Sequence, residues 1–439
     1  MLKLELIVAL GILMCGQVLF WRRRDNIFGY FQAGLFFASV LIPVLGTTLI
    51  DTADPDVVNL YARILLVGAI AYLVGLCCGA PIGARSRRPR VSFAERFDDA
   101  PRKLVRRSRV VAVVGVLGLI AAFALLGYAP LLAADRVSAK YGVGPYRAGF
   151  MRGAQVFNLA LTLASTITAV LVALIAIRRR AVDIVLLVAL VVGMSLTLSR
   201  GLALTGPLAF LIAWGIERRW RPWRLLVIVC LSFVAGALVN ELTFVKTPVA
   251  SASFSSRVAG TVPDIPDHLG FLQGFHLLGG EHVGLKTIRA GVSLTVSKGY
   301  WDPADYALRV RTGLPDVTEL ASGGLRLPAP VWGYAAYGYL GVVVWSAIAG
   351  FFTGWGTTLL RRLLADVEHG RYRHQALNLV LAWIFYNGTF VVLALFYFPA
   401  RSEIVVVGLA FWLCVFKIRS TSESPAGEDG ATLRPAAQA

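Results

Sequence analysis

The chain alternates between long apolar runs and short polar segments rich in arginine and lysine. Uninterrupted apolar runs of about 17 to 25 residues match the length of a helix that spans a bilayer. Such runs lie near residues 3–21, 27–50, 59–80, 109–127, 156–177, 181–199, 201–216, 224–244, 329–356, 375–398 and 403–417. The pattern therefore predicts an all-α integral membrane protein with about eleven transmembrane helices.

Clusters of positive charge give these helices an orientation. They follow every odd-numbered run, at residues 22–24, 85–109, 178–180, 218–224, 361–373 and 417–419. Because arginine and lysine accumulate in cytoplasmic loops, we expect the N-terminus outside and the C-terminus in the cytoplasm. This orientation predicts a membrane domain at 1–417, a large extracytoplasmic loop at 244–328 within it, and a disordered cytoplasmic tail at 418–439.

The run from residue 181 to residue 216 has a single charge in its middle stretch at 196–211, Arg200. As one helix it would be about 54 Å long, too long for a hydrocarbon core of about 30 Å. Both of its ends carry cytoplasmic-type arginines, so we expect two crossings joined by an outer turn at residues 199–201. Gly201 is suited to a left-handed turn conformation, and Arg200 then faces outward or reaches lipid headgroups.

Composition narrows the function classes. The chain is 57% hydrophobic and 15% charged, and its net charge of +18 lies in topological clusters, so nucleic acid is not an expected partner. All five cysteines lie in apolar runs without zinc-binding spacing. Neither a phosphate-binding glycine-rich loop nor a metal-binding motif occurs, and we expect no cofactor and no metal. The first apolar run precedes its arginines, which favours a retained span over a signal peptide.

The predicted outer loops are unusually basic. Their cations are Arg136, Lys140, Arg147 and Arg152 in the loop at 124–155, and Lys246, Arg257, Lys286, Arg289, Lys298, Arg309, Arg311 and Arg326 in the large loop. Outer loops normally avoid such residues. Because the arginine fork matches phosphate oxygens, these residues predict an outward-facing phosphate or pyrophosphate site.

Aromatic and titratable residues accompany these cations. Tyr141, Tyr146, Trp301 and Tyr334 can stack on sugar rings, although an interfacial aromatic belt is an alternative role. Three histidines lie in the large loop, at positions 268, 276 and 282. A histidine or carboxylate suits proton removal from an attacking hydroxyl. Glu281 and His282, in the dense polar stretch GGEHVGLKTIRAG, are the expected catalytic pair.

Four stretches resemble a known family. They are LTLSRGLAL around Arg200, GYAPLLAADR at 127–136, RLPAPVWGYAAYGYLGVVV at 326–344, and FPARSEI with Arg401. With the layout of spans and one dominant outer loop, they are similar to the bacterial O-antigen polymerases and oligosaccharide repeat-unit polymerases, and more distantly to the O-antigen ligases. The loop histidines lack the ligase pattern of a polar residue two positions later and glycines about ten further on, which favours a polymerase.

The resemblance implies a metal-independent glycosyltransferase in the bacterial cytoplasmic membrane. It would transfer a glycan from a polyprenyl-diphosphate donor to a sugar hydroxyl of another lipid-linked repeat unit on the outer face. The diphosphate would bind Arg200, Arg136, Arg147, Arg289, Arg326 and Arg401. Expected partners are the lipid-linked oligosaccharide, membrane lipid, a chain-length regulator and a flippase. Another lipid-linked glycosyltransferase, an O-antigen ligase, and a polysaccharide exporter or flippase are the alternatives.

Overall fold

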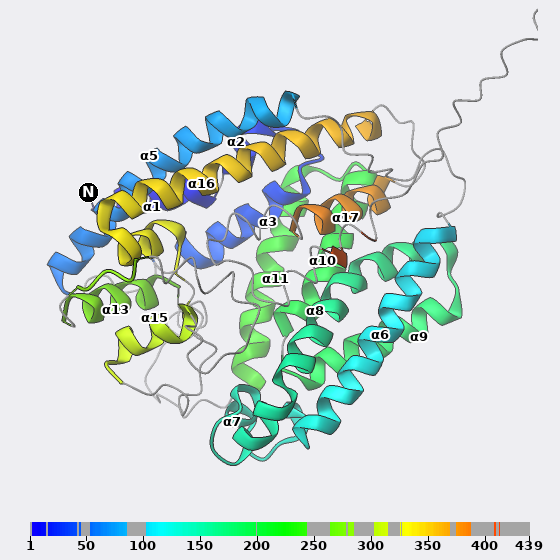
Figure 1. The fold of residues 1–439 in the computed structure, drawn as a ribbon. Coiled ribbons are helices and arrows are strands. Elements are labelled where there is room, and N and C mark those ends of the chain that lie inside the picture. Colours follow the sequence, from blue (N-terminus) through cyan, green and yellow to red (C-terminus); the bar gives the residue numbers. More distant parts are fainter. Residues whose placement is uncertain are drawn as a thin grey trace, which may run out of the picture.

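A computed structural model shows the chain as a bundle of α-helices (Figure 1). No β-strand occurs among the residues that it describes, which confirms the all-α fold class for them. The described residues are 2–14, 16–41, 44, 53–85, 102–198, 200–243, 264–277, 280–284, 303–314, 325, 327–368, 375–387, 408–409 and 412.

Helices occupy the apolar runs within the described ranges. They are α1 (Leu2–Met14), α2 (Gly16–Phe20), α3 (Ile27–Phe36) with the π-helical turn η1 (Phe37–Leu41), α5 (Pro55–Arg85), α6 (Arg102–Leu126), α8 (Arg147–Arg178), α9 (Ala181–Leu196), α10 (Arg200–Glu217), α11 (Pro222–Thr243), α16 (Ala329–Glu368) and α17 (Gln375–Tyr386). The predicted final run at 403–417 lies almost entirely outside the described residues, so the number of about eleven spans stays a prediction.

Short helices that the apolar pattern does not predict lie between these long ones. The loop after α6 contains η2 (Pro130–Leu132), α7 (Arg136–Tyr141) and η3 (Gly144–Tyr146), and the large loop contains α13 (Asp264–Leu277) and α15 (Pro303–Thr312). Both loops are therefore structured where they are described.

Four helical stretches within the described ranges are long and apolar enough to cross a membrane: 55–85, 102–126, 136–178 and 329–362. Large apolar side chains remain exposed on their outer faces. These include Ile70 and Val74 on α5, Leu117 and Ile120 on α6, and Leu340 on α16. Continuous exposed apolar surface is unfavourable in water and suits a lipid environment, so the packing agrees with the membrane class that the sequence predicts.

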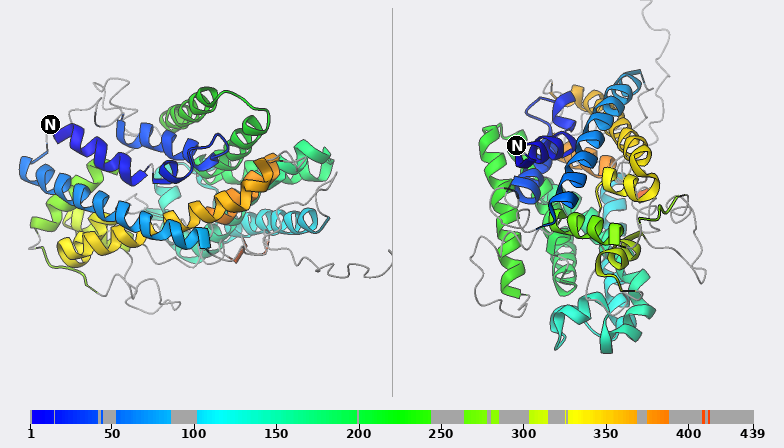
Figure 2. Two further views of the ribbon diagram at one scale, coloured as in Figure 1. Left: turned by 90° about the horizontal axis from the view of Figure 1, so that it is seen from above. Right: turned by 90° about the vertical axis from the view of Figure 1, so that its left-hand side faces the viewer.

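The helices α5 and α16 pack against each other over their length, and they lie side by side in all views (Figures 1 and 2). Gly75 and Gly79 of α5 touch the backbone at Ala347 and Phe351 of α16, so any side chain at either glycine would overlap a carbonyl group. The order of these contacts shows that the two helices run parallel. Such close approach, made possible by small residues, is typical of helix packing in membranes.

Arginines at one end of the bundle bind the ends of neighbouring helices. Arg361 donates to the carbonyl of Phe20 at 3.0 Å, and Arg362 donates to that of Gly83 at 3.1 Å. Glu217 accepts a 2.9 Å hydrogen bond from the backbone nitrogen of Ala376, at the start of α17. Arg24 also donates to the carbonyl of Trp220. The described parts of the chain next to the predicted clusters at 22–24, 85–109, 218–224 and 361–373 thus meet at a common end. Which membrane face this end occupies stays a prediction.

The turn between α9 and α10 differs in detail from the expectation. The left-handed residue is Leu198, with φ of 62°, whereas Gly201 lies inside α10. The buried hydroxyl of Thr197 donates to the carbonyl of Met194 at 2.6 Å, which helps to end α9 before this point. The assignment of the left-handed position to Gly201 was therefore wrong, although the chain does divide into two helices here.

Candidate functional site

The helix α16 is broken at Tyr337 and Gly338. Tyr337 has φ of −146° and ψ of 27°, and Gly338 has φ of 62° and ψ of −147°, a combination essentially restricted to glycine. Residues 329–336 fold back against the long second segment, where the backbones of Gly333 and Gly341 touch so closely that neither position has room for a side chain. The break creates a short helix that folds back on the long segment at the start of α16.

A loop segment of four residues, 281–284, is bound to this break. The backbone nitrogen of Val283 donates to the carbonyl of Ala335, and that of Gly284 donates to the carbonyl of Ala336, both at 3.0 Å. The last carbonyls of a helix lack intrahelical partners, so the loop supplies the donors that the interrupted helix cannot. Gly280 and Gly284 have φ of 66° and 60°, which shapes the loop around the break.

His282 lies against the break and is exposed. Its ring centroid is 5.9 Å from that of Tyr334, in an edge-on geometry, and 5.7 Å from that of Phe275 at the end of α13. A β-carbon built on Gly338 would lie 3.4 Å from Nε2 of His282. The structure thus brings the predicted base His282 and the predicted sugar-stacking Tyr334 into contact.

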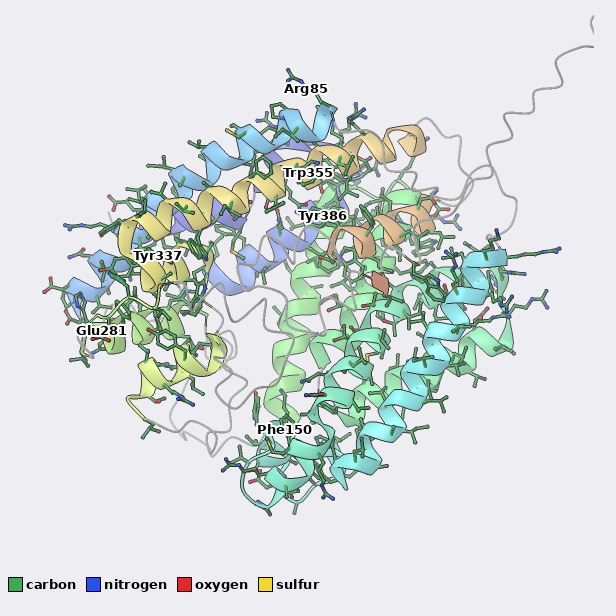
Figure 3. All side chains as sticks on the ribbon, in the orientation of Figure 1. Arg85, Phe150, Glu281, Tyr337, Trp355 and Tyr386 are labelled. Carbon is green, nitrogen blue, oxygen red and sulfur yellow. The ribbon has the colours of Figure 1, made fainter. Side chains whose placement is uncertain are left out.

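Glu281 and Tyr339 complete this cluster. Glu281 precedes His282 and is exposed at one edge of the molecule, near the labelled Tyr337 (Figure 3). The ring of Tyr339, which is 43% exposed, lies 5.5 Å from that of Tyr334. We call the cluster of Glu281, His282, Tyr334, Gly338 and Tyr339 the kink site. It combines a proton acceptor with aromatic surface at a helix break.

The helices α13 and α15 form one wall of the kink site. Tyr306 of α15 packs edge-on against Trp332, with ring centroids 6.2 Å apart, and also against Phe271 of α13. Burial raises the pKa of Tyr306 to about 12, so its hydroxyl stays protonated at neutral pH. Arg311 forms an ion pair with Asp267, which joins the two helices. Tyr306 therefore packs α15 against the start of α16.

The other described candidates lie in the loop between α6 and α8. Asp135 caps α7 by accepting hydrogen bonds at 3.0 Å from the backbone nitrogens of Val137 and Ser138. These bonds, led by the one to Ser138, lower the pKa of the Asp135 carboxyl. The side chains of Arg136 and Arg147 are exposed, and Tyr146 packs against Tyr128 with ring centroids 4.8 Å apart.

This loop is not part of the kink site. Phe150, which packs under Gly142 of the loop, and Glu281 lie at different edges of the molecule (Figure 3). The structure therefore divides the described candidates into two groups: Arg136, Tyr141, Tyr146 and Arg147 in the first loop, and Glu281, His282 and Tyr334 at the kink site. Lys140 lies over the ring of Tyr141, 5.1 Å from its centroid.

The other predicted site residues, or their side chains, lie outside the described part of the structure. Arg200 is the first residue of α10, but its side chain is outside the described part of the structure. Arg289, Trp301, Arg326 and Arg401 also lie outside the described residues. Their proposed contacts with a diphosphate or a sugar stay predictions.

Two features of the kink site were missed by sequence reasoning. The sequence pattern does not single out Phe275 as a site residue, although its spacing from His268 and Phe271 on α13 is the helical i, i+3, i+7 pattern that places residues on one face. The backbone donors of Val283 and Gly284 leave no sequence signal beyond the glycine itself. Within the described ranges, no group of three or more His, Cys, Asp or Glu side chains is placed to hold a metal ion.

Comparison of the chain with models of protein families, with curated proteins and with solved structures finds no significant match.

Proposed function

We propose that this protein is a membrane-embedded glycosyltransferase that polymerises oligosaccharide repeat units. Its donor is a glycan attached to a polyprenyl diphosphate, and its acceptor is a sugar hydroxyl of another lipid-linked unit. The observation that supports this proposal best is the kink site, where an exposed histidine, a neighbouring carboxylate and two tyrosine rings meet at the broken start of an apolar helix.

In the proposed reaction, the acceptor hydroxyl oxygen attacks the anomeric carbon of the donor. The bond between that carbon and the diphosphate oxygen breaks, and the new glycosidic bond forms. His282 or Glu281 takes the hydroxyl proton. The leaving diphosphate keeps the bonding electron pair, and its negative charge is stabilised by arginines.

Each group of side chains has a part in this proposal. Tyr334 and Tyr339 offer ring faces to the sugar. Arg200, Arg289, Arg326 and Arg401 are the proposed diphosphate ligands near the reaction centre. Arg136 and Arg147 belong to the separate first loop, so we assign them to phosphate groups that bind away from His282.

The reaction fits the predicted topology of about eleven spans with the large loop outside. The kink site then lies at the outer face of a bacterial cytoplasmic membrane, where lipid-linked repeat units are presented. The lipid-facing helices would let the polyprenyl chain remain in the bilayer while its headgroup reaches His282.

Transfer by the purified protein would test this function. The protein in nanodiscs is incubated with lipid-diphosphate-linked repeat units, and the products are separated by size. A ladder of longer glycans is expected. Products lengthened only on a different acceptor, such as lipid A core, would indicate a ligase instead. Movement of intact lipid-linked units across liposomes without bond formation would indicate a flippase.

The residue assignment needs a matched pair of variants. His282→Ala should lower the transfer rate by about 100-fold or more, the usual contribution of a general base. His276→Ala, at an exposed histidine of α13, should retain transfer. Equal activity of both variants, at equal protein level, would remove His282 from the mechanism.

A further inference from the structure

The turn between α10 and α11, together with the start of α11, has the sequence RRWRPWR, residues 218–224. Its four arginines are exposed, and Trp223 is 56% exposed. A role in orienting the helices accounts for the positive charge, but that role needs no tryptophan between the arginines. Indole rings beside guanidinium groups suit the boundary between lipid hydrocarbon and phosphate headgroups. The turn is therefore a candidate lipid-binding surface.

Hydrogen bonds fix the backbone of this turn. The backbone nitrogen of Trp220 donates to the carbonyl of Gly215 at 2.8 Å, and that of Arg219 donates to the carbonyl of Ile216 at 3.0 Å. This pair of bonds is the Schellman motif, in which the residue after the helix is left-handed and usually glycine. Here that residue is Arg219, with φ of 55°. Pro222 then begins α11, where its fixed φ suits the first helical position. The turn thus presents an arginine at a position where glycine would be less strained.

Aromatic contacts hold the side chains of the turn. The rings of Trp214 and Trp220 pack edge-on, with their centroids 5.2 Å apart. The guanidinium of Arg218 lies 5.6 Å from the centroid of the Trp214 ring, and that of Arg224 lies 5.6 Å from the centroid of the Trp223 ring. Both distances are within the range of a cation–π contact. These contacts leave the guanidinium N–H groups available to an anion, because a ring face accepts no in-plane hydrogen bond.

A second basic segment, residues 22–24, is joined to this turn. The side chain of Arg24 donates to the carbonyl of Trp220. Residues 22–24 are all exposed. The helices that follow the two segments also touch, because α3 packs against α10 and α11. We call residues 22–24 and 218–224 the Arg–Trp patch.

The charge of this patch is poorly balanced. Residues 22–25 and 217–224 contain seven arginines but only two carboxylates. Asp25 accepts a 3.0 Å hydrogen bond from the indole nitrogen of Trp21, and Glu217 accepts a 2.9 Å hydrogen bond from the backbone nitrogen of Ala376. Both carboxylates thus bind groups other than the arginines of the patch. An exposed excess of arginine favours an anionic ligand.

We propose that the Arg–Trp patch is a binding site for the headgroups of anionic phospholipids. The lipid phosphate accepts paired hydrogen bonds from the arginines, and the ring of Trp223 lies at the level of the headgroups. A lipid bound to both segments would hold the connection between α2 and α3 against the turn between α10 and α11. The site is separate from the proposed glycan transfer, so either proposal can fail without the other.

Thermal unfolding of the full-length protein in detergent tests this site. Fluorescence-detected gel filtration after heating gives the unfolding temperature during titration with phosphatidylglycerol, with phosphatidylcholine of the same acyl chains, or with inorganic phosphate. Phosphatidylglycerol should raise the unfolding temperature, because a ligand of the folded state stabilises it. Phosphatidylcholine should raise it less, because its choline group cancels the phosphate charge. An equal effect of phosphatidylcholine or of inorganic phosphate would overturn the proposal of an anionic lipid site.

Two glycine variants form a matched pair. Arg219 and Arg179 are both exposed and left-handed, with φ of 55° and 47°, but the segment 178–180 contains no tryptophan. Each change to glycine removes one charge, and neither should impair folding because glycine takes this conformation without strain. Arg219→Gly should raise the half-saturating concentration of phosphatidylglycerol about fivefold, the usual contribution of one arginine at an anionic surface. Arg179→Gly should behave like the wild type, and equal shifts in the two variants would refute the site.

Trp223→Ala tests the aromatic part of the patch, because it keeps every arginine. Loss of the exposed ring should also raise the half-saturating concentration of phosphatidylglycerol. If this variant binds phosphatidylglycerol as the wild type does, the patch acts only through its charge and the proposed site is wrong. Glycan transfer is not needed for any of these measurements, so a protein that binds the lipid but transfers no glycan would support this site while the proposed function fails.

Discussion

Gly338→Ala is the sharpest test of the kink site because it adds one methyl group at the break of α16. The φ of 62° and ψ of −147° at this position are poorly accessible to alanine, and forcing them costs about 1 to 3 kcal/mol. The added carbon would lie 3.4 Å from Nε2 and 3.6 Å from Cε1 of His282. These are ordinary contact distances, so the methyl group covers the ring nitrogen without a severe clash.

Two outcomes should follow together. The variant should unfold at a lower temperature, as measured by fluorescence-detected gel filtration after heating. Its transfer rate in the size-ladder assay should fall on the order of 100-fold, the cost of a misplaced reacting group. If Gly338→Ala lowers the unfolding temperature but leaves the transfer rate unchanged, the contact with His282 has no role in transfer.

Gly127→Ala is the matched control. Gly127 also has a positive φ, 78°, but no atom lies within 4 Å of a β-carbon built there. The Gly127→Ala variant therefore measures the effect of backbone strain alone, because it adds no contact with His282. If Gly338→Ala retains as much transfer activity as Gly127→Ala at equal amounts of folded protein, the assignment of His282 to the reaction centre is refuted.

Three other changes test the diphosphate ligand, the bundle and the topology. Arg200→Ala should abolish polymer at normal protein level, and Arg200→Lys should restore little because a point charge replaces a two-pronged donor; long-chain product from the alanine variant would exclude this ligand. Asp183 is 0% exposed and accepts bonds of 2.7 and 3.0 Å from Arg109. Arg109→Leu should reduce the yield of folded protein, and adding Asp183→Leu should restore it, since the first change leaves the buried Asp183 carboxylate unpaired, which costs about 3 to 5 kcal/mol; an equally poor double variant would contradict this. Single cysteines at Arg136 and His282 should react with an impermeant thiol reagent in intact cells, and reaction only after lysis would reverse the predicted orientation.

The helices were predictable because their cause is local. An apolar run of sufficient length in a membrane must satisfy its backbone hydrogen bonds internally, so it forms a helix regardless of its neighbours. The division of residues 181–216 into α9 and α10 follows from the same length argument. The position of the turn was not predictable by that argument, because the left-handed residue is Leu198, whose side chain has no preference for that conformation.

Individual residues of the kink site could be predicted from the sequence, but their contact could not. His282 and Tyr334 were expected on chemical grounds, but they are 52 positions apart and no local periodicity indicates that they touch. Their contact depends on the break at Gly338 and on the return of the large loop to it. The separation of Arg136 and Arg147 from His282 is likewise a property of how α8 and α16 pack in different parts of the bundle (Figure 1).

The break in α16 also explains how a loop can hold a reactive group in place. Ala335 and Ala336 each have a carbonyl that the next turn of helix would normally satisfy, and Val283 and Gly284 replace those donors. Leaving a buried carbonyl without a partner costs about 1 to 3 kcal/mol. Moving residues 283–284 away would leave both carbonyls without a donor at once. The two hydrogen bonds therefore hold the loop against the helix. His282, adjacent to these two donors, therefore has the fixed position that a general base requires, although it lies on a loop.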